Sequence, residues 1–347
     1  MELRVYDLDL NRKGVIDNFR SLIWTRKYYE SGTFEIYAPL TQSNIDLLKQ
    51  ERLVAKDGSI EVGIIESIEL TDQANKKQIV VKGRFLSSLL ERRLIKSTFS
   101  FNGLTEVAMN DLISVVEPIP NLSTTALNGF TDKVTFQATM KNLLTIMTKL
   151  SKTSNIGFRV ATDFANKKLA FETYKGIDRS ASQSANNKVI FSENFENIND
   201  TSYSYNSTLY KTKVIVGGEG EGSDRVYVEL GGGEGYNLRE VFVDAKDIQS
   251  MEFSTNEEYL DALKQRGQEK LSSMVEVEAF DYQTSAMGNF KYKKDYDLGD
   301  IVTICKESWG ISLNKRITGI EEVYEQGGVI INPTLGEPIP ESISWED

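Results

Sequence analysis

The sequence contains no histidine, one cysteine and only six prolines among its 347 residues. Histidine is the usual general base, proton carrier and transition-metal ligand near neutral pH. Its absence excludes Ser-His-Asp and Cys-His catalysis and most zinc sites. An enzyme built from this chain would have to use carboxylate, lysine or tyrosine chemistry, or a site for a hard cation.

The one cysteine, Cys305, lies in the apolar run 301–305. We expect it to be a small buried hydrophobic residue, and no disulfide can form within the chain. The N-terminal segment 1–6 alternates like a strand and lacks the layout of a signal peptide. No apolar stretch reaches the length of a membrane span. We therefore expect a soluble protein that folds in a reducing cytoplasm and has no membrane anchor.

Positive charge is also scarce, because 40 Lys and Arg residues stand against 51 Asp and Glu residues, a formal net charge of −11. The summed field of such a chain repels phosphate backbones and anionic lipid, so stable nucleic acid binding is not expected. The hydrophobic content of 40% is nevertheless enough for a sizeable core, and the length allows two to four domains.

Residues 1–96 are predicted to form an N-terminal, tube-like β-barrel domain. Asp57-Gly58 suits a tight hairpin turn between two of its strands, because this dipeptide tolerates positive φ angles. Leu86, Leu89 and Leu90 have helical spacing and predict a short helix at the end of the domain. Period-two alternation predicts strands over 3–8, 21–26, 32–38, 52–56, 59–70 and 78–85.

The rest of the chain is predicted to form three further parts. Residues 97–188 indicate an α/β inserted domain, with helical spacing over 104–115 and 140–150. Residues 189–250 indicate a β-meander that completes or bridges the barrels. Residues 251–347 indicate a helix followed by a second β-barrel domain, and Thr255 with Glu258 predicts a capping box where that helix begins.

The two ends of the chain share a pattern of short strand, turn, long strand, turn and strand. Near the N-terminus it spans 52–56, 59–70 and a strand from Gln78, and near the C-terminus it spans 300–305, 311–325 and a strand from Val329. The fold class we predict is therefore a β-rich α+β, multi-domain chain. It would contain two small tube-like β-barrel or β-sandwich domains with an α/β insertion.

Two segments resemble known ligand loops only superficially. The glycine clusters 217–222 and 231–235 each follow a predicted strand. A phosphate loop needs a helix directly after its glycines, but Arg225–Glu229, which follows the first cluster, has the pattern of another strand. We interpret the clusters as exposed hairpin turns. The segment 295–300 has its glycine fifth rather than sixth and precedes a β-run, so we predict a turn entering a strand. Adventitious cation binding there stays open.

Pairs of carboxylates and a group of aromatic residues are the other candidates. Glu66 with Glu69, or Glu321 with Glu322, could serve a glycosidase, but alternating acids usually mark the solvated face of a strand. Five aromatic residues could bind sugar, but aromatic side chains on strands more often pack into a core or an interface. They are Trp24, Tyr28, Tyr29, Phe34 and Tyr37. We assign no catalytic, cofactor-binding or metal-binding residue and no cofactor.

Several strings together resemble the siphovirus Gp37-like family of phage and prophage tail proteins, which is related in architecture to tail hub proteins. They run in order from Leu22 to near Gly336, so the resemblance covers almost the whole chain. The strings are 22–30 with Gly32 and 34–35, 63–66, 81–90, 218–222 with 225–226, 240–245 and 292–302.

The resemblance implies a structural tail hub or baseplate protein, not an enzyme, in the virion tail tip and, during assembly, in the bacterial cytoplasm. Such hubs form rings, typically homotrimers, in which two barrels per subunit give a pseudo-sixfold collar that joins the tail tube to the tail tip. Expected partners are distal tail or tube proteins on one side and a spike, fibre or lytic protein on the other. Two alternatives remain: a receptor- or carbohydrate-binding tail module, and a cell-wall hydrolase.

Overall fold

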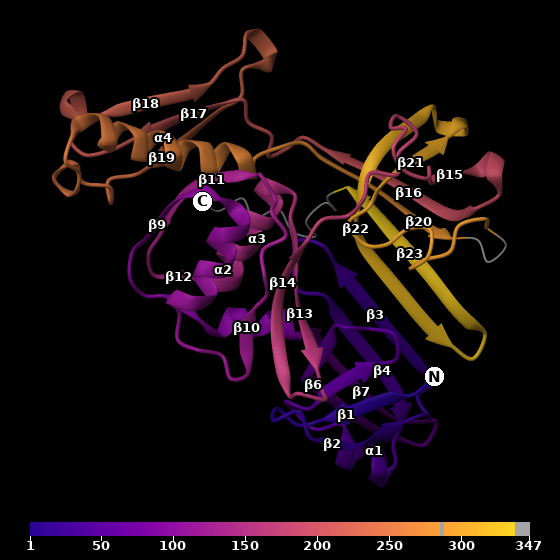
Figure 1. Ribbon diagram of the computed structural model, residues 1–347. Helices are drawn as coiled ribbons and strands as arrows, with labels where there is room; N and C mark the ends of the chain where they lie inside the picture. The colour runs from indigo at the N-terminus through magenta and orange to yellow at the C-terminus, as the bar shows by residue number, and fades with distance from the viewer. Residues whose placement is uncertain (285–287, 337–347) are drawn as a thin grey trace. The chain divides into compact units, whose positions relative to one another are not determined.

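The computed structural model describes residues 1–284 and 288–336, which fall into two compact units (Figure 1). Unit 1 contains 1–202 and 280–336, and unit 2 contains 203–279. The chain leaves unit 1 along strand β16 (Ile198–Asn206) and returns along β20 (Val277–Thr284). The predicted four-part division at 96, 188 and 250 stays a prediction.

The first part of unit 1 is a set of antiparallel strands with one short helix, α1 (Gln42–Leu47). In β3 the buried Leu22 and Trp24 alternate with the half-buried Ile23 and Thr25, because successive side chains of a strand point to opposite faces. The strands are β1 (Leu3–Tyr6), β2 (Arg12–Ile16), β3 (Ser21–Lys27), β4 (Thr33–Pro39), β5 (Leu53–Lys56), β6 (Val62–Gln73) and β7 (Lys76–Phe85). The predicted turn at Asp57-Gly58 joins β5 to β6, with φ +71° at Gly58.

The last part of unit 1 is β15 (Ile190–Ser192), β21 (Ile301–Lys306), β22 (Ile311–Glu325) and β23 (Gly328–Gly336), together with β16 and β20. β22 pairs with β3, so strands about 300 positions apart in the sequence lie side by side (Figure 1). Within the described residues this pairing joins thirteen strands into one sheet. The β-rich fold is confirmed, but the strands of both ends form one continuous sheet in place of two separate closed barrels.

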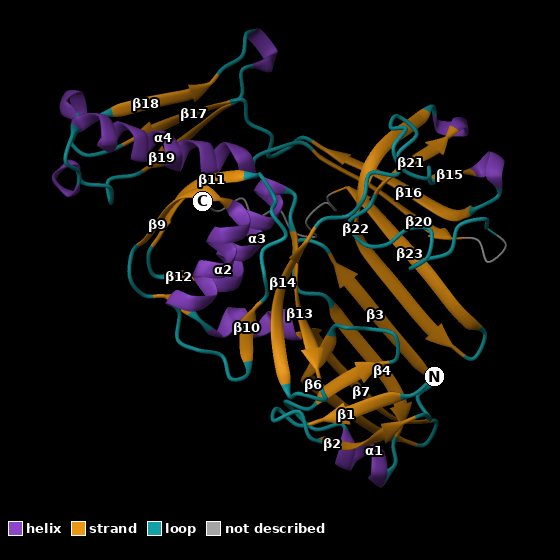
Figure 2. Cartoon of the chain, in the orientation of Figure 1, coloured by secondary structure: helices purple, strands orange, loops and turns teal. Residues whose placement is uncertain are grey.

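The inserted segment carries two helices, α2 (Thr105–Val115) and α3 (Leu143–Ser154), and several short strands (Figure 2). The strands are β8 (Leu94–Ile95), β9 (Phe99–Leu104), β10 (Leu122–Thr124), β11 (Lys133–Ala138), β12 (Lys141–Asn142), β13 (Gly157–Asp163) and β14 (Lys168–Tyr174). Helix α3 begins after Asn142, whose side chain caps it, and so excludes Met140, which is 68% exposed. The predicted helix after β7 is the 3₁₀ helix Leu86–Arg92.

The described part of unit 2 contains a three-stranded sheet with one α-helix, α4 (Asn256–Ser273), packed on one of its faces. Its strands are β17 (Lys213–Gly217), β18 (Tyr227–Gly231) and β19 (Glu240–Asp244). The predicted capping box of Thr255 and Glu258 is confirmed. Gly267 is required where α4 meets the sheet, because a Cβ there would lie 2.8 Å from Val216 and Leu230. No helix in the described part of the chain is both long enough and apolar enough to span a bilayer.

Among the described residues, four groups of buried side chains form separate cores. One lies within the sheet of β1 to β7, one between that sheet and the inserted segment, one among the C-terminal strands, and one in unit 2. Cys305 is half-buried, not fully buried as predicted, and its Sγ lies 3.4 Å from the Ser312 Oγ. Val302 and Ile304 occupy the core instead, because alternation turns Cys305 to the other face of β21.

Two meanders, β5–β6–β7 and β21–β22–β23, repeat the same pairing. Ser67 pairs with Lys82 and Gly319 pairs with Thr334, so both residues of the second pair stand 252 positions after their counterparts. Both long strands shift register at the same place, between Ile65 and Ser67 and between Ile317 and Gly319. The backbone hydrogen bonds beside the two shifts also match. In β6, Glu51 N donates to Ile65 O and Ile65 N donates to Arg52 O, both at 2.9 Å. In β22, Gly299 N donates to Ile317 O at 2.9 Å and Ile317 N donates to Asp300 O at 2.8 Å.

Candidate functional site: the outer face of the large sheet

One face of the large sheet is covered by the cores, and the other is open over β6, β7, β4, β3, β22 and β23. We call the open side the outer face. Cross-strand partners on it stand in registered rows, such as Ser67, Lys82, Glu35, Ile23 and Val323. Because β22 continues the sheet from β3, each row contains residues from both ends of the chain. The outer face is thus one surface that neither end of the chain forms alone.

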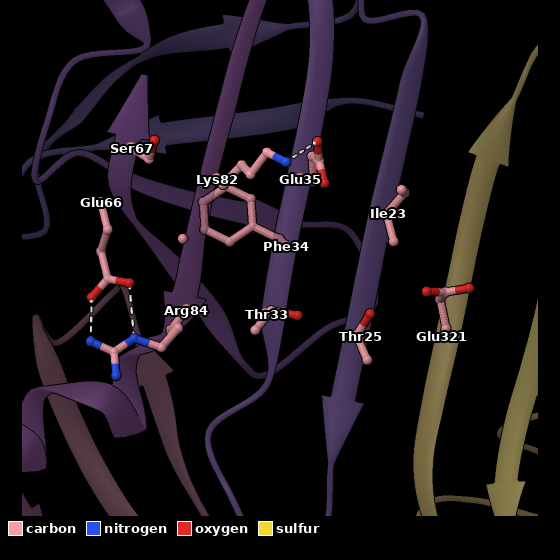
Figure 3. A pocket seen from close by; sticks show the side chains of 11 residues that line it. Ile23, Thr25, Thr33, Phe34, Glu35, Glu66, Ser67, Lys82, Arg84 and Glu321 are labelled. Carbon is pink, nitrogen blue, oxygen red and sulfur yellow. Dashed lines mark hydrogen bonds and ion pairs between the residues drawn. The ribbon is translucent and has the colours of Figure 1, made fainter. Parts of the chain in front are cut away.

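Two open hollows of about 430 and 470 Å³ lie on this face. Thr25 and Glu321 line both hollows, which therefore adjoin one another. Figure 3 shows the first hollow, where the labelled side chains come from β3, β4, β6, β7 and β22. The second is also lined by Asp200, Asp281, Gln283, Asn332, Pro333 and Thr334, among others.

The two bases that line the first hollow are paired with carboxylates (Figure 3). Arg84 donates two hydrogen bonds of 2.9 Å to Glu66 and forms an ion pair of 2.6 Å with Glu91. Lys82 lies 2.8 Å from Glu35. Burial raises the pKa of Glu35, but hydrogen bonds from Lys82 and Tyr37 outweigh burial and leave that pKa lowered.

Further acids extend along the outer face. Glu321 accepts a hydrogen bond of 3.0 Å from the Asn332 amide, and Asp200 and Asp281 line the second hollow. Since Lys82 and Arg84 are already paired, these acids give the face an excess of negative charge. A polyanion is repelled by such a surface, whereas neutral and basic protein surfaces are not.

A cluster of buried charges lies on the core side of the same strands. The Arg26 guanidinium donates to Glu61 at 2.7 Å, to Asp297 at 2.7 Å and to the Tyr292 hydroxyl at 2.8 Å. Because Asp297 and Tyr292 come from the C-terminal part of the chain, this one side chain ties the two ends together. A buried charge with several partners is costly to disrupt, since removal of one partner leaves the others unpaired.

The second half of this cluster is the buried pair of Lys56 and Glu322. The Lys56 ammonium also donates to the Tyr324 hydroxyl at 2.9 Å. Burial lowers the pKa of Lys56, against the opposing effect of Glu322. Burial by itself would raise the pKa of Glu322, but the Lys56 charge and hydrogen bond leave it lowered.

The carboxylates considered as a glycosidase pair therefore have different roles. Glu66 and Glu321 lie on the outer face, as the solvated-face interpretation predicts, whereas Glu322 is buried and the prediction for it was wrong. The available signal was parity, because Glu322 alternates in step with Ile320, which lies in the core. Parity also marks Arg26, which alternates in step with the buried Leu22 and Trp24. It does not mark Lys56, because all four residues of β5 are buried.

The five aromatic candidates lie mostly in cores. Trp24, Tyr28, Tyr29 and Phe34 are buried, which confirms the packing interpretation for these four residues. The Trp24 ring centroid lies 4.6 Å from that of Phe85. Tyr37 alternates with the buried residues of β4 and is half-buried on the outer face.

The two loop candidates are held by protein groups. After the first glycine cluster the chain enters a 3₁₀ turn and then β18, as predicted, and Arg225 donates to the Gly217 and Gly218 carbonyls at 2.8 and 3.0 Å. The segment 295–300 is a turn before β21, and Asp300 accepts a hydrogen bond of 2.9 Å from Arg179. Within residues 1–284 and 288–336, no three or more Asp, Glu or Cys side chains gather as metal ligands.

The fold is similar to that of solved phage and prophage tail proteins. A 43 kDa tail protein of prophage MuSo2 from Shewanella oneidensis is 13% identical and superimposes with a TM-score of 0.61 over 96% of this chain and 98% of that one. A tail protein from Neisseria meningitidis is 14% identical, with a TM-score of 0.60 over 96% of each chain. A prophage tail protein, gp18, from Listeria monocytogenes is 14% identical, with a TM-score of 0.51 over 99% and 96%.

Residues 2–337 match the family model described as Siphovirus ReqiPepy6 Gp37-like protein. The chain belongs to this family, as its sequence strings predicted, and it is a phage or prophage tail protein. Comparison with curated proteins gave no match.

Proposed function

We propose that this tail protein is a structural, non-enzymatic hub that forms a ring between the tail tube and the tail tip. The observation that carries the proposal is the repeated meander inside one sheet. A subunit with two similar modules presents two similar surfaces, so three copies can meet a sixfold tube. A homotrimer is accordingly the assembly that we expect.

The outer face would line the central channel of this ring. Its excess of carboxylates supports that placement, because a channel through which DNA passes should not retain the phosphate backbone. The pairing of Lys82 with Glu35 and of Arg84 with Glu66 neutralises the bases that would otherwise attract phosphate.

The ring would contact distal tail or tube proteins on one side and a spike, fibre or lytic protein on the other. Its site of action would be the baseplate or tail tip of the virion, and assembly would take place in the bacterial cytoplasm. The four predicted parts remain the domain organisation that we propose, with one β-meander module from each end of the chain within the single sheet. The carbohydrate-binding alternative is weakened, because four of its five aromatic residues are buried in cores.

Electron microscopy of the assembled particle, with this chain labelled, tests the proposal. We expect label at the tail tip, in a ring coaxial with the tube. Label along the tail shaft or in the capsid would contradict the hub assignment. A peptidoglycan digestion assay tests the enzyme alternative, and turnover that is lost in Glu66→Gln or Glu321→Gln would contradict the non-enzymatic role.

A further inference from the structure

Strand β6 has one edge that is only partly paired within the described residues. β7 pairs with Gly63 to Gln73, but β5 reaches only from Val62 to Ile64. Beyond this point the segment 67–73 has no strand on its β5 side in the described sheet. Its counterpart in β22, the segment 319–325, pairs with β3 on that side. The repeat is therefore complete at β22 and incomplete at β6.

The difference is visible in the side chains that point to the core side. Ile320 and Glu322 of β22 are 0% and 1% exposed. Their counterparts, Ile68 and Leu70, are 39% and 54% exposed. An apolar pair on an edge strand loses contact with water when another strand is added beside it, and that burial favours the addition.

The backbone of the same residues faces the open side. Tyr28 N donates to Thr318 O at 2.9 Å, so the backbone N–H and C=O groups of Thr318 point toward β3. Every second residue of β22 after Thr318 points its backbone groups the same way. By alternation, these residues include Ile320 and Glu322. Residues of β6 lie 252 positions before their counterparts in β22. The backbone groups of Ile68, Leu70 and Asp72 therefore point to the corresponding side of β6, which is the open side. Their N–H and C=O groups are thus oriented to receive a further antiparallel strand.

The C-terminal strands contain a counterpart of β3. In the sheet, β3 lies beside β4, and β4 lies beside β7. In the repeat, β16 lies beside β20, and β20 lies beside β23, the counterpart of β7. β16 is therefore the counterpart of β3, and it is the terminal strand at that end of the described sheet. The short connection 28–32 between β3 and β4 corresponds to unit 2, which is inserted between β16 and β20.

We propose that the 67–73 segment of β6 pairs antiparallel with residues 198–202 of β16 from a second copy of the chain. This joint repeats between copies the contact that β22 makes with β3 inside each copy. The same joint applied in succession is heterologous, so it closes into a ring when the rotation permits. The proposal rests on the proposed ring function and specifies which strands form the subunit contact.

Charge does not attract the two strands to one another, because the charged side chains of both segments are all acidic. The β6 segment carries Glu69 and Asp72, whereas the 198–202 segment has one charged residue, Asp200. Main-chain hydrogen bonds would hold the two strands together, as in other proteins that add a strand to an open sheet edge. Ile68 and Leu70 would be covered by the added strand.

Leu70→Pro tests the joint in the full-length chain. Proline removes the N–H that faces the open side and leaves the bonds to β7 in place, so the protomer should remain folded. We expect the ring to be lost from assembled tails while the far-UV circular dichroism spectrum stays unchanged. Leu70→Lys should act in the same way, because an inward-pointing charge on an edge strand opposes pairing. Thr71→Lys is the matched control, since it adds the same charge on the outer face, and its ring should form.

Cross-linking identifies the partner strand. In a Cys305→Ser background, Leu70→Cys combined with Asn199→Cys or Thr201→Cys should give disulfide-linked multimers from assembled tails. We expect a ladder on a non-reducing gel that ends at the ring stoichiometry. Leu70→Cys alone in the same background should give no such ladder.

The outcomes separate this joint from the proposed function. If the wild-type chain forms a ring at the tail tip and Leu70→Pro forms the same ring, the joint is wrong and the hub function stands. A ring whose position 70 cross-links to a strand other than β16 would likewise contradict the joint and leave the hub function standing. If the wild-type chain forms no ring, the proposed function fails and the joint fails with it.

Discussion

The two meanders have the same backbone geometry and different surroundings. β22 lies in the interior of the sheet between β3 and β23, whereas β6 beyond Ile65 has a neighbour only on the β7 side in the described sheet. Corresponding side chains follow this difference, since Glu322 is buried against Lys56 and Leu70 is exposed. Hairpin turns and register therefore set the backbone geometry of both meanders. The presence or absence of a neighbouring strand decides whether their core-side side chains are buried.

The largest effect should come from exchanging the residue at this position of the repeat. Glu322→Leu introduces the residue found in β6 and leaves Lys56 buried without its carboxylate, which should cost about 3–5 kcal/mol of unfolding free energy. Chemical denaturation measures the loss. Leu70→Glu, the reverse exchange, should change stability by less than about 1 kcal/mol, because Leu70 is exposed in the protomer.

The double variant Lys56→Met/Glu322→Leu distinguishes a missing partner from a missing side chain. It should recover most of the loss, because no buried charge remains unpaired. Equal destabilisation in the double and single variants would show that the pair acts through shape and not through charge.

The second-largest effect should occur beside the register shift. Gly83 corresponds to Leu335, but a Cβ at Gly83 would lie 1.8 Å from the Ile64 carbonyl oxygen. Gly83→Ala should therefore cost about 3 kcal/mol, measured as a lowered denaturation midpoint, because the backbone must move. A midpoint equal to that of the wild type would mean that the backbone moves away from the added Cβ at little cost and that glycine is not required at position 83.

The pH dependence of stability should distinguish the joint between β22 and β3 from the open edge. The pKa of Glu322 is lowered from 4.5, so its contribution is present above that pH and is lost as the pH falls through the folded-state pKa. Between pH 5 and pH 3 the wild type should lose more stability than Lys56→Met/Glu322→Leu, as measured by urea unfolding. If the unfolding free energies of the two proteins fall equally with pH, carboxylates other than Glu322 cause the acid sensitivity.

The smallest effect should come from Gly319→Ser, which introduces the residue of the β6 counterpart Ser67. The added Cβ would lie 3.5 Å from the Thr334 Cβ, an ordinary contact. The change should alter the unfolding free energy by no more than about 0.5 kcal/mol in calorimetry. A larger loss would mean that glycine is required at this register shift although serine is accepted at the other.

Much of the fold was accessible from residue patterns. The C-terminal meander was predicted as 300–305, 311–325 and a strand from 329, close to the observed β21, β22 and β23, because turns and alternation are local signals. The capping box of α4 was predicted for the same reason. The start of α3 was placed too early because Asn142 was not recognised as its cap.

The candidate surface was less accessible. Glu66 and Glu321 were recognised as solvated acids, but nothing local indicates that they share one face. That face exists because β22 pairs with β3, and no local pattern in the sequence predicted this pairing. The buried position of Glu322 follows from the same contact.

By itself, the sequence determined the chemistry that is absent, through the lack of histidine, and the position of most strands, through alternation and turns. The tertiary structure alone decided which of two equivalent strands is interior and which has an open edge. The physical reason is that a strand in a meander forms backbone hydrogen bonds with its hairpin neighbours, which are close in the sequence. The backbone groups on its remaining edge need a strand that is distant in the sequence or belongs to another chain. For β22 that partner is β3; for β6 we propose that it is β16 of another copy.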